Sequence, residues 1–133
     1  MKILLDTNVL IAAFVARGAC HELLEHCARQ HTLITSDFIL SEFREKLTGK
    51  FKYSQERADE AAELLISRMK VVTAAPLDVP VCRDPDDDNV LAAAVAGDCD
   101  CLITGDQDLL VIGRSHDLEI LRPADFRDYE GAE

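Results

Sequence analysis

The sequence lacks an apolar run long enough to cross a membrane, and no basic stretch precedes its first apolar segment. We therefore expect a cytoplasmic protein without a membrane anchor. An excess of positive charge is also missing, because 25 acidic residues stand against 14 basic ones for a net charge of −11. This balance excludes a protein that coats nucleic acid through a broad basic surface, and it suits a basic protein partner.

Cysteine and histidine patterns that build disulfides or zinc sites are missing as well. The five cysteines are an odd number without framework spacing, which favours reduced, partly buried thiols. His21 and His26 do not lie three or four residues apart on their predicted helix, and His31 and His116 stand alone. We therefore interpret all four histidines as surface or partly buried residues, and the sequence argues against a zinc site.

Apolar segments alternate with helical patterns along the 133 residues, of which 48% are hydrophobic. This alternation is typical of one α/β domain with a mostly parallel sheet. Strands are predicted at residues 2–5, 32–35, 69–73, 101–103 and 119–121. Helices are predicted at 8–30 with a break near Gly18, at 37–49, at 55–67 and at 85–96, before a docked tail over 123–133 that ends in disorder.

Four acidic residues stand where such a fold would bring them together. Asp6 and Asp106 each follow an apolar run, and the helices that carry Glu42 and Asp88 begin at the same edge of the sheet. Two carboxylates about 4 Å apart repel by roughly 4 kcal/mol at an effective dielectric near 20, so the cluster requires protons or cations. Ligands that are all oxygen suit Mg²⁺ or Mn²⁺, and we expect one or two of these ions.

Each acid also has a purely structural interpretation. Asp6 and Asp106 are suited to cap the helices that follow them. Glu42 can pair with Lys46 one helical turn later on the surface.

The acidic residues at 84–88 have a structural interpretation too, because negative charge in the first turn of a helix complements its dipole. Helical spacing places Asp87 and Asp88 equally well on the face that carries Leu91. Periodicity therefore does not choose between these two acids.

Four segments, in this order along the chain, together resemble the PIN-domain family. They are LLDTNVL at 4–10, SEF at 41–43, DNVLAAA at 88–94 and LITGDQDLL at 102–110. The resemblance implies a three-layer α/β/α fold around a central, mostly parallel five-stranded sheet and a Mg²⁺- or Mn²⁺-dependent ribonuclease activity. For many small bacterial and archaeal members it also implies the toxin of a toxin–antitoxin pair, and it suggests a homodimer.

The resemblance assigns roles to the acids by position. It implies that Asp6, Asp88 and Asp106 hold the ion and that Glu42 contacts it through water or helps to hold a second ion. Its pattern, an acid followed three residues later by a large aliphatic residue and then two alanines, selects Asp88. Neighbours that could orient or assist this site are Thr7, Asn8, Asp84, Asp87, Thr104 and Asp108.

A few basic and aromatic residues could lead single-stranded RNA to the site. Phe51 and Tyr53 are candidates for stacking on bases. The candidate basic contacts are Arg17, Arg44, Lys46, Lys50, Lys52, Arg83 and Arg114.

Other α/β functions fit less well. A phosphatase of the haloacid-dehalogenase type would have a second aspartate two residues after Asp6, where this chain has Asn8. A receiver domain would have a lysine near Thr104, and a dinucleotide enzyme would have a glycine-rich turn after the first strand. The remaining alternative of a different class is a catalytically idle PIN-like module that binds RNA or protein.

Overall fold

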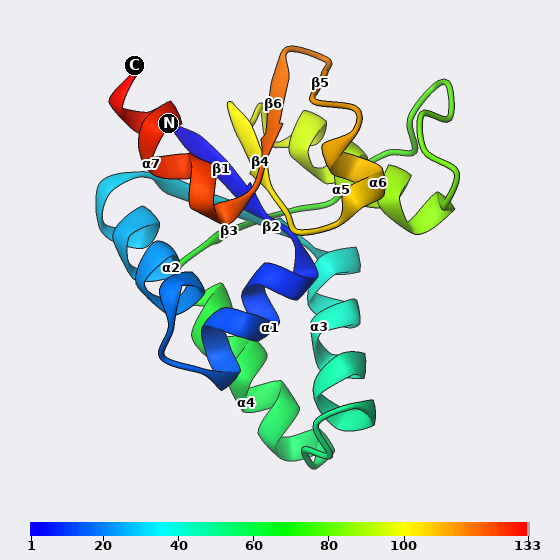
Figure 1. The fold of residues 1–133 in the computed structure, drawn as a ribbon. Helices are drawn as coiled ribbons and strands as arrows, with labels where there is room; N and C mark the ends of the chain where they lie inside the picture. The colour runs from blue at the N-terminus through cyan, green and yellow to red at the C-terminus, as the bar shows by residue number, and fades with distance from the viewer. Residues whose placement is uncertain (133) are drawn as a thin grey trace.

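The computed structural model describes residues 1–132 and has a six-stranded sheet at its centre (Figure 1). The strands follow the spatial order β3-β2-β1-β4-β6-β5, and each neighbouring pair is parallel except β5 with β6. The predicted α/β fold with a mostly parallel sheet is therefore confirmed. The strands are β1 (Lys2–Leu5), β2 (Thr32–Ser36), β3 (Lys70–Val72), β4 (Cys101–Ile103), β5 (Arg114–Ser115) and β6 (Leu118–Leu121).

The direction of the connections decides which face of the sheet each helix covers. The chain steps outward from β1 to β2 and β3, then crosses back to β4 on the other side of β1. Because crossovers between parallel strands are right-handed, this reversal places α1 to α4 on the opposite side of the sheet from α5 and α6 (Figure 1). The helices are α1 (Thr7–Val15), α2 (Ala19–Gln30), α3 (Asp37–Gly49), α4 (Gln55–Ile66), α5 (Pro85–Ala96), α6 (Gln107–Leu110) and α7 (Phe126–Gly131).

Local sequence signals start three of these helices where they were predicted. The side chains of Ser36, Ser54 and Asp84 each accept a hydrogen bond from a backbone N–H two or three residues later. Such a bond satisfies one of the amide groups that a helix leaves unpaired at its start. Pro85, which needs no amide partner, occupies the first turn of α5.

The structure adds three elements to those predicted. The two-residue strand β5 pairs antiparallel with β6, so the sheet has six strands where five were expected; so short a strand has no detectable periodicity. The tail docks as predicted, but it forms a 3₁₀ turn (Pro123–Asp125) and α7, anchored by the buried Phe126. Disorder was also expected at the end of this tail. Residue 133, at that end, lies outside the described residues.

The helices are short and turn one face toward the core. The longest, α3, has 13 residues and buries Ile39, Phe43 and Leu47. Within residues 1–132, none of the helices combines the length and the apolar character that crossing a membrane requires.

The functional edge of the sheet follows from its strand order. The chain leaves the central strand β1 toward β2 and later returns to β4 on its other flank, so the carboxyl ends of β1 and β4 form the point where strand order reverses. In open parallel sheets, ligands bind at this point. Asp6 follows β1 directly, and Asp106 follows β4 by three residues.

Candidate active site

Asp6 lies beside an acidic cluster at the carboxyl edge of the sheet. Its side chain is only 7% exposed. Oδ1 accepts a hydrogen bond from the Thr7 amide at 2.7 Å, and Oδ2 accepts one from the Thr104 hydroxyl at 2.7 Å. Both oxygens of the carboxylate are therefore held in a fixed orientation, and the capping role expected for Asp6 coexists with its place in the cluster.

Thr104 connects Asp6 to the second strand end. It is fully buried, and its hydroxyl oxygen accepts a hydrogen bond from the Asp106 amide at 3.0 Å while its hydrogen goes to Asp6. Asp106 in turn caps α6 through the Asp108 amide at 2.8 Å. One buried hydroxyl thus positions the backbone of one acid relative to the carboxylate of the other.

The structure brings Asp87, and not Asp88, to this cluster. Carboxylate oxygens of Asp87, Asp106 and Asp108 lie within 4.8 Å of one another. Asp88 points to the preceding loop instead, where its Oδ1 accepts hydrogen bonds from the amides of Val81 and Cys82 at 3.1 and 2.8 Å.

The two neighbouring acids accordingly have opposite pKa shifts. Burial, followed by the charges of Asp106, Asp84, Asp6 and Asp108, raises the pKa of Asp87 to about 6. Burial also acts on Asp88, but its hydrogen bonds to the loop outweigh it and lower the pKa of Asp88 below its usual value. Sequence periodicity could not separate them, because the loop at 81–82 that captures Asp88 is irregular.

Burial also raises the pKa of Asp6, and the nearby charge of Asp106 adds to this effect. Hydrogen bonds from Thr104 and Thr7 lower the same pKa, as does the positive charge of Lys46. The net shift of the Asp6 pKa is upward, which means that its surroundings destabilise the charged carboxylate. A bound cation would offset this destabilisation.

Glu42 faces the cluster from α3. Its Oε1 accepts a hydrogen bond from the Thr7 hydroxyl at 2.7 Å, whereas Lys46 donates to the Asn8 side chain at 2.7 Å. The surface pairing of Glu42 with Lys46 is therefore not the arrangement found. Burial raises the pKa of Glu42, while Thr7 and Lys46 lower it and Asp6 raises it further.

Two further acids predicted to assist the site are Asp84 and Asp108. Asp84 caps α5 by accepting a hydrogen bond from the Asp86 amide, and its negative charge contributes to the raised pKa of Asp87. Asp108 lies in the cluster and also forms an ion pair with Arg83 at 2.7 Å. A positive side chain therefore already stands at the rim of the acidic site.

Few of the basic residues proposed for RNA lie beside the cluster. Lys46 and Arg83 do, through Asn8 and Asp108. Two others are placed elsewhere: Arg44 pairs with Asp59 at 3.2 Å, and Arg114 on β5 pairs with Glu119 on β6 at 2.6 Å. The Lys50 ammonium lies over the Phe51 ring. Arg17 and Lys52 are exposed.

The aromatic residues proposed for stacking are only partly available. Arg57 lies over the Tyr53 ring at 4.5 Å from its centroid, and Phe14 packs edge-on against it. Phe51 and Lys50 line a groove of 480 Å³ that extends to Lys46 and Asn8. Phe51 is therefore the better placed of the two rings.

The donor set of the cluster is composed of carboxylate oxygens, with hydroxyl and amide groups behind them. Such a set fits a hard divalent cation such as Mg²⁺ or Mn²⁺, which prefers oxygen ligands. Asp87, Asp106 and Asp108 could hold such an ion, and Asp6 lies outside this group but near enough for its charge to raise the pKa of Asp87. The expected one-site or two-site stoichiometry remains a prediction.

Comparison with known proteins identifies the class of protein that this fold and site define. The sequence profile described as PIN domain matches residues 2–108, and the chain therefore belongs to the PIN-domain family. A search of curated protein sequences finds no match.

Several solved structures share this fold. VapBC2 from Rickettsia felis, bound to a DNA fragment from its promoter, matches with a TM-score of 0.64 at 17% identity, covering 90% of this chain and 97% of that chain. VapBC-1 from nontypeable Haemophilus influenzae matches at 0.63 and 20%, covering 93% and 99%. VapC20 from Mycobacterium tuberculosis, a toxin that cleaves the sarcin-ricin loop, matches at 0.59 and 15%, covering 88% and 98%.

Proposed function

We propose that this chain is a divalent-metal-dependent endoribonuclease and the toxin of a toxin–antitoxin pair. The observation that carries the proposal is the convergence of Asp87, Asp106 and Asp108 beside the buried, hydrogen-bonded Asp6 at the switch point of the sheet. Membership of the PIN-domain family and the similarity of its fold to VapC proteins support the same conclusion.

In this proposal Asp6, Asp87 and Asp106 hold the ion, and Asp87 takes the place that the sequence resemblance gave to Asp88. Asp108 is an accessory ligand. When bound, Mg²⁺ or Mn²⁺ would supply a polarised water and positive charge for the phosphodiester. Neither a nucleophilic side chain nor a catalytic histidine is required.

The surrounding residues act by orienting these groups. Thr7 and Thr104 fix the two oxygens of Asp6, so that little reorganisation is needed when a cation binds. Glu42, held by the Thr7 hydroxyl, is positioned to accept a hydrogen bond from a water at the ion. Lys46 supplies a positive charge beside the acids for the phosphate of single-stranded RNA.

The charge of the chain and two structures of similar fold support a proposal for its partners. A net charge of −11 suits a basic antitoxin, and two structures of similar fold are VapBC assemblies. A homodimer remains part of the proposal, with the exposed Leu64 on α4 as a candidate contact. Light scattering of the purified chain, alone and with a candidate antitoxin, measures both assemblies.

A cleavage assay tests the activity. Purified wild type is incubated with a pool of single-stranded RNA in Mn²⁺, Mg²⁺ or EDTA, beside Asp6→Asn and the control Asp128→Asn from the remote helix α7. We expect cleavage by wild type and by the control, at least 100-fold less by Asp6→Asn, and none in EDTA. Metal binding without cleavage of any RNA would favour an idle PIN-like binding module instead.

A further inference from the structure

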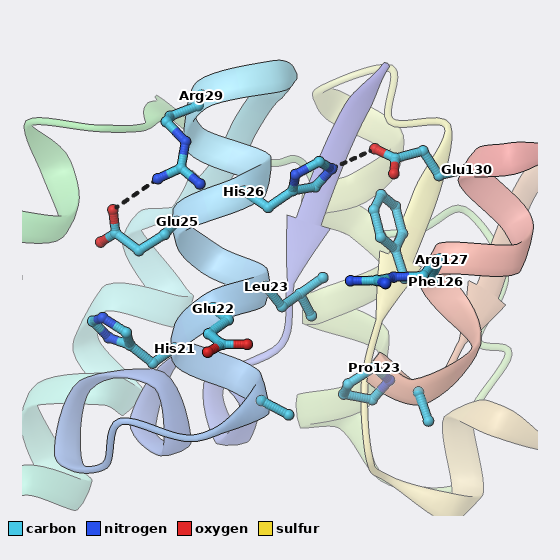
Figure 2. A pocket seen from close by; sticks show the side chains of 12 residues that line it. His21, Glu22, Leu23, Glu25, His26, Arg29, Pro123, Phe126, Arg127 and Glu130 are labelled. Carbon is cyan, nitrogen blue, oxygen red and sulfur yellow. Dashed lines mark hydrogen bonds and ion pairs between the residues drawn. The ribbon is translucent and has the colours of Figure 1, made fainter.

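A second group of metal-ligating side chains lies at the opposite edge of the sheet. Nε2 of His26 and Nε2 of His31 lie 2.7 and 2.5 Å from the same oxygen, Oε2 of Glu130. Figure 2 shows His26 on α2 reaching across a groove toward Glu130 on α7. Three donor atoms from segments about 100 residues apart in sequence therefore meet at one point.

This group is separate from the acidic cluster. His31 ends α2 just before β2, and its Nδ1 lies 3.3 Å from the N-terminal nitrogen of Met1, at the start of β1. Asp6 follows the other end of the same strand, about 16 Å away at roughly 3.3 Å per strand residue. The two groups therefore cannot share an ion.

The donor atoms distinguish this group chemically from the acidic cluster. Two imidazole nitrogens with one carboxylate oxygen are ligands that zinc prefers, and such three-ligand sites leave a fourth position for water. The acidic cluster, with oxygen ligands alone, suits a harder cation. The histidines that are scattered in sequence are thus brought together only by the tertiary structure.

The surroundings suit metal ligation. The His31 side chain is 12% exposed and packs edge-on against the Phe126 ring at 6.0 Å. His26 is 42% exposed and borders a groove of 970 Å³, which leaves an open side for a water ligand. The His31 side of the group is therefore enclosed, and the His26 side is accessible to an ion.

The distances need only a small adjustment to admit an ion. Tetrahedral zinc with bonds of 2.0–2.1 Å separates its ligands by about 3.3 Å. The nitrogen-to-oxygen distances of 2.5 and 2.7 Å would have to open by less than about 1 Å, which side-chain rotation in an open groove permits.

We propose that His26, His31 and Glu130 form a zinc site that fastens the C-terminal helix α7 to α2 and to the start of the sheet. The site is independent of the nuclease proposal. It would stabilise α7, a helix of six residues in which Phe126 is the one buried anchor among the described residues.

Metal titration of untagged, chelator-treated protein tests the site. Zn²⁺ is titrated by calorimetry with millimolar Mg²⁺ present to occupy the acidic cluster, and Co²⁺ absorption reports the coordination. Wild type should bind one Zn²⁺, give the strong visible bands of four-coordinate Co²⁺, and unfold at a higher temperature with Zn²⁺. His26→Gln and Glu130→Gln should bind Zn²⁺ at least 10-fold more weakly.

His21→Gln is the matched control, because His21 lies on the same helix and lines the same groove outside the group. It should keep wild-type Zn²⁺ affinity. His26→Gln should retain the melting temperature of metal-free wild type, since its side chain is nearly half exposed, and should retain Mg²⁺-supported RNA cleavage. Equal Zn²⁺ affinity of wild type and His26→Gln, or no binding by wild type at 100 μM Zn²⁺, would overturn the proposal and leave three hydrogen-bonded side chains.

Discussion

The Thr104 hydroxyl donates a hydrogen bond of 2.7 Å to Oδ2 of Asp6, which joins the ends of the adjacent strands β4 and β1. Both residues are buried, so the bond forms where competing water is excluded. Through the Asp106 amide, the same hydroxyl also sets the start of α6. The geometry of the proposed ion site therefore depends on a residue that contributes no ligand to it.

Replacing Thr104 by valine should weaken the site without changing any proposed ligand. Loss of the hydroxyl leaves Oδ2 of Asp6 and the Asp106 amide without their hydrogen-bond partner, which costs about 1–3 kcal/mol of unfolding free energy. We expect Mg²⁺ affinity to fall roughly 10- to 100-fold. Urea unfolding and calorimetry measure the two effects.

Thr35→Val is the matched control for Thr104→Val. Thr35 on β2 is also fully buried, but its hydroxyl oxygen has no hydrogen-bond partner within residues 1–132. Its replacement should leave stability unchanged or raise it slightly, with no change in Mg²⁺ affinity. Equal loss of Mg²⁺ affinity in both variants would contradict a specific role for Thr104.

Asp87→Asn should abolish activity, whereas Asp88→Asn should mainly lower stability. Asp87→Asn removes a proposed ligand, so we expect Mg²⁺ binding and RNA cleavage to be lost. Asp88→Asn weakens the charge-assisted hydrogen bonds to Val81 and Cys82, so it should cost about 1 kcal/mol of stability and keep cleavage within a few-fold. If Asp88→Asn abolished cleavage and Asp87→Asn did not, the assignment would be reversed.

The metal-free protein should become more stable as pH falls toward 5. The pKa of Asp87 is about 6 in the folded chain against its usual 3.8, so between these values the folded state binds more protons. Stability therefore decreases as pH rises through this window and stays lower above pH 6. Thermal unfolding in EDTA at several pH values measures this dependence.

Asp87→Asn isolates the contribution of this one carboxylate to the pH dependence. At pH 7 without metal, the variant should be more stable than wild type by roughly 1 kcal/mol, after allowance for solvent screening at a partly exposed group. The difference should shrink toward pH 4. Asp86→Asn, an exposed neighbour on the same helix turn, should show no such gain; a variant less stable than wild type at pH 7 would contradict the origin of the shift.

Arg83→Ala should separate metal binding from RNA binding. Arg83 pairs with Asp108 and competes with a cation for that carboxylate. Its removal should raise Mg²⁺ affinity up to about 3-fold, because an exposed ion pair is weak. RNA should bind several-fold more weakly with a shallower salt dependence, since one phosphate contact is lost.

Arg29→Ala is the control for charge alone. Arg29 is exposed on α2 and lines the groove beside His26, away from the acidic cluster. It should change neither Mg²⁺ affinity nor the salt dependence of RNA binding. Fluorescence anisotropy of a labelled RNA over a series of salt concentrations compares the two variants. Identical salt slopes for Arg83→Ala and wild type would exclude Arg83 as a phosphate contact.

The sequence by itself determined the α/β class, the parallel strands β1, β2, β3, β4 and β6, and the edge of the sheet near which Asp6, Glu42 and Asp106 lie. These features depend on apolar periodicity and on cap residues such as Ser36 and Ser54, which act within a few residues. Their order along the chain was also enough to indicate the PIN-domain family, which the matching profile confirms.

The tertiary structure alone decided which of two adjacent aspartates faces the cluster, because an irregular loop supplies the amides that bind Asp88. It likewise brought His26 and His31 to Glu130, at separations of 104 and 99 residues. Periodicity reports which face of an element is buried. Which polar side chain finds which partner depends on how distant elements pack, and that information is absent from local sequence.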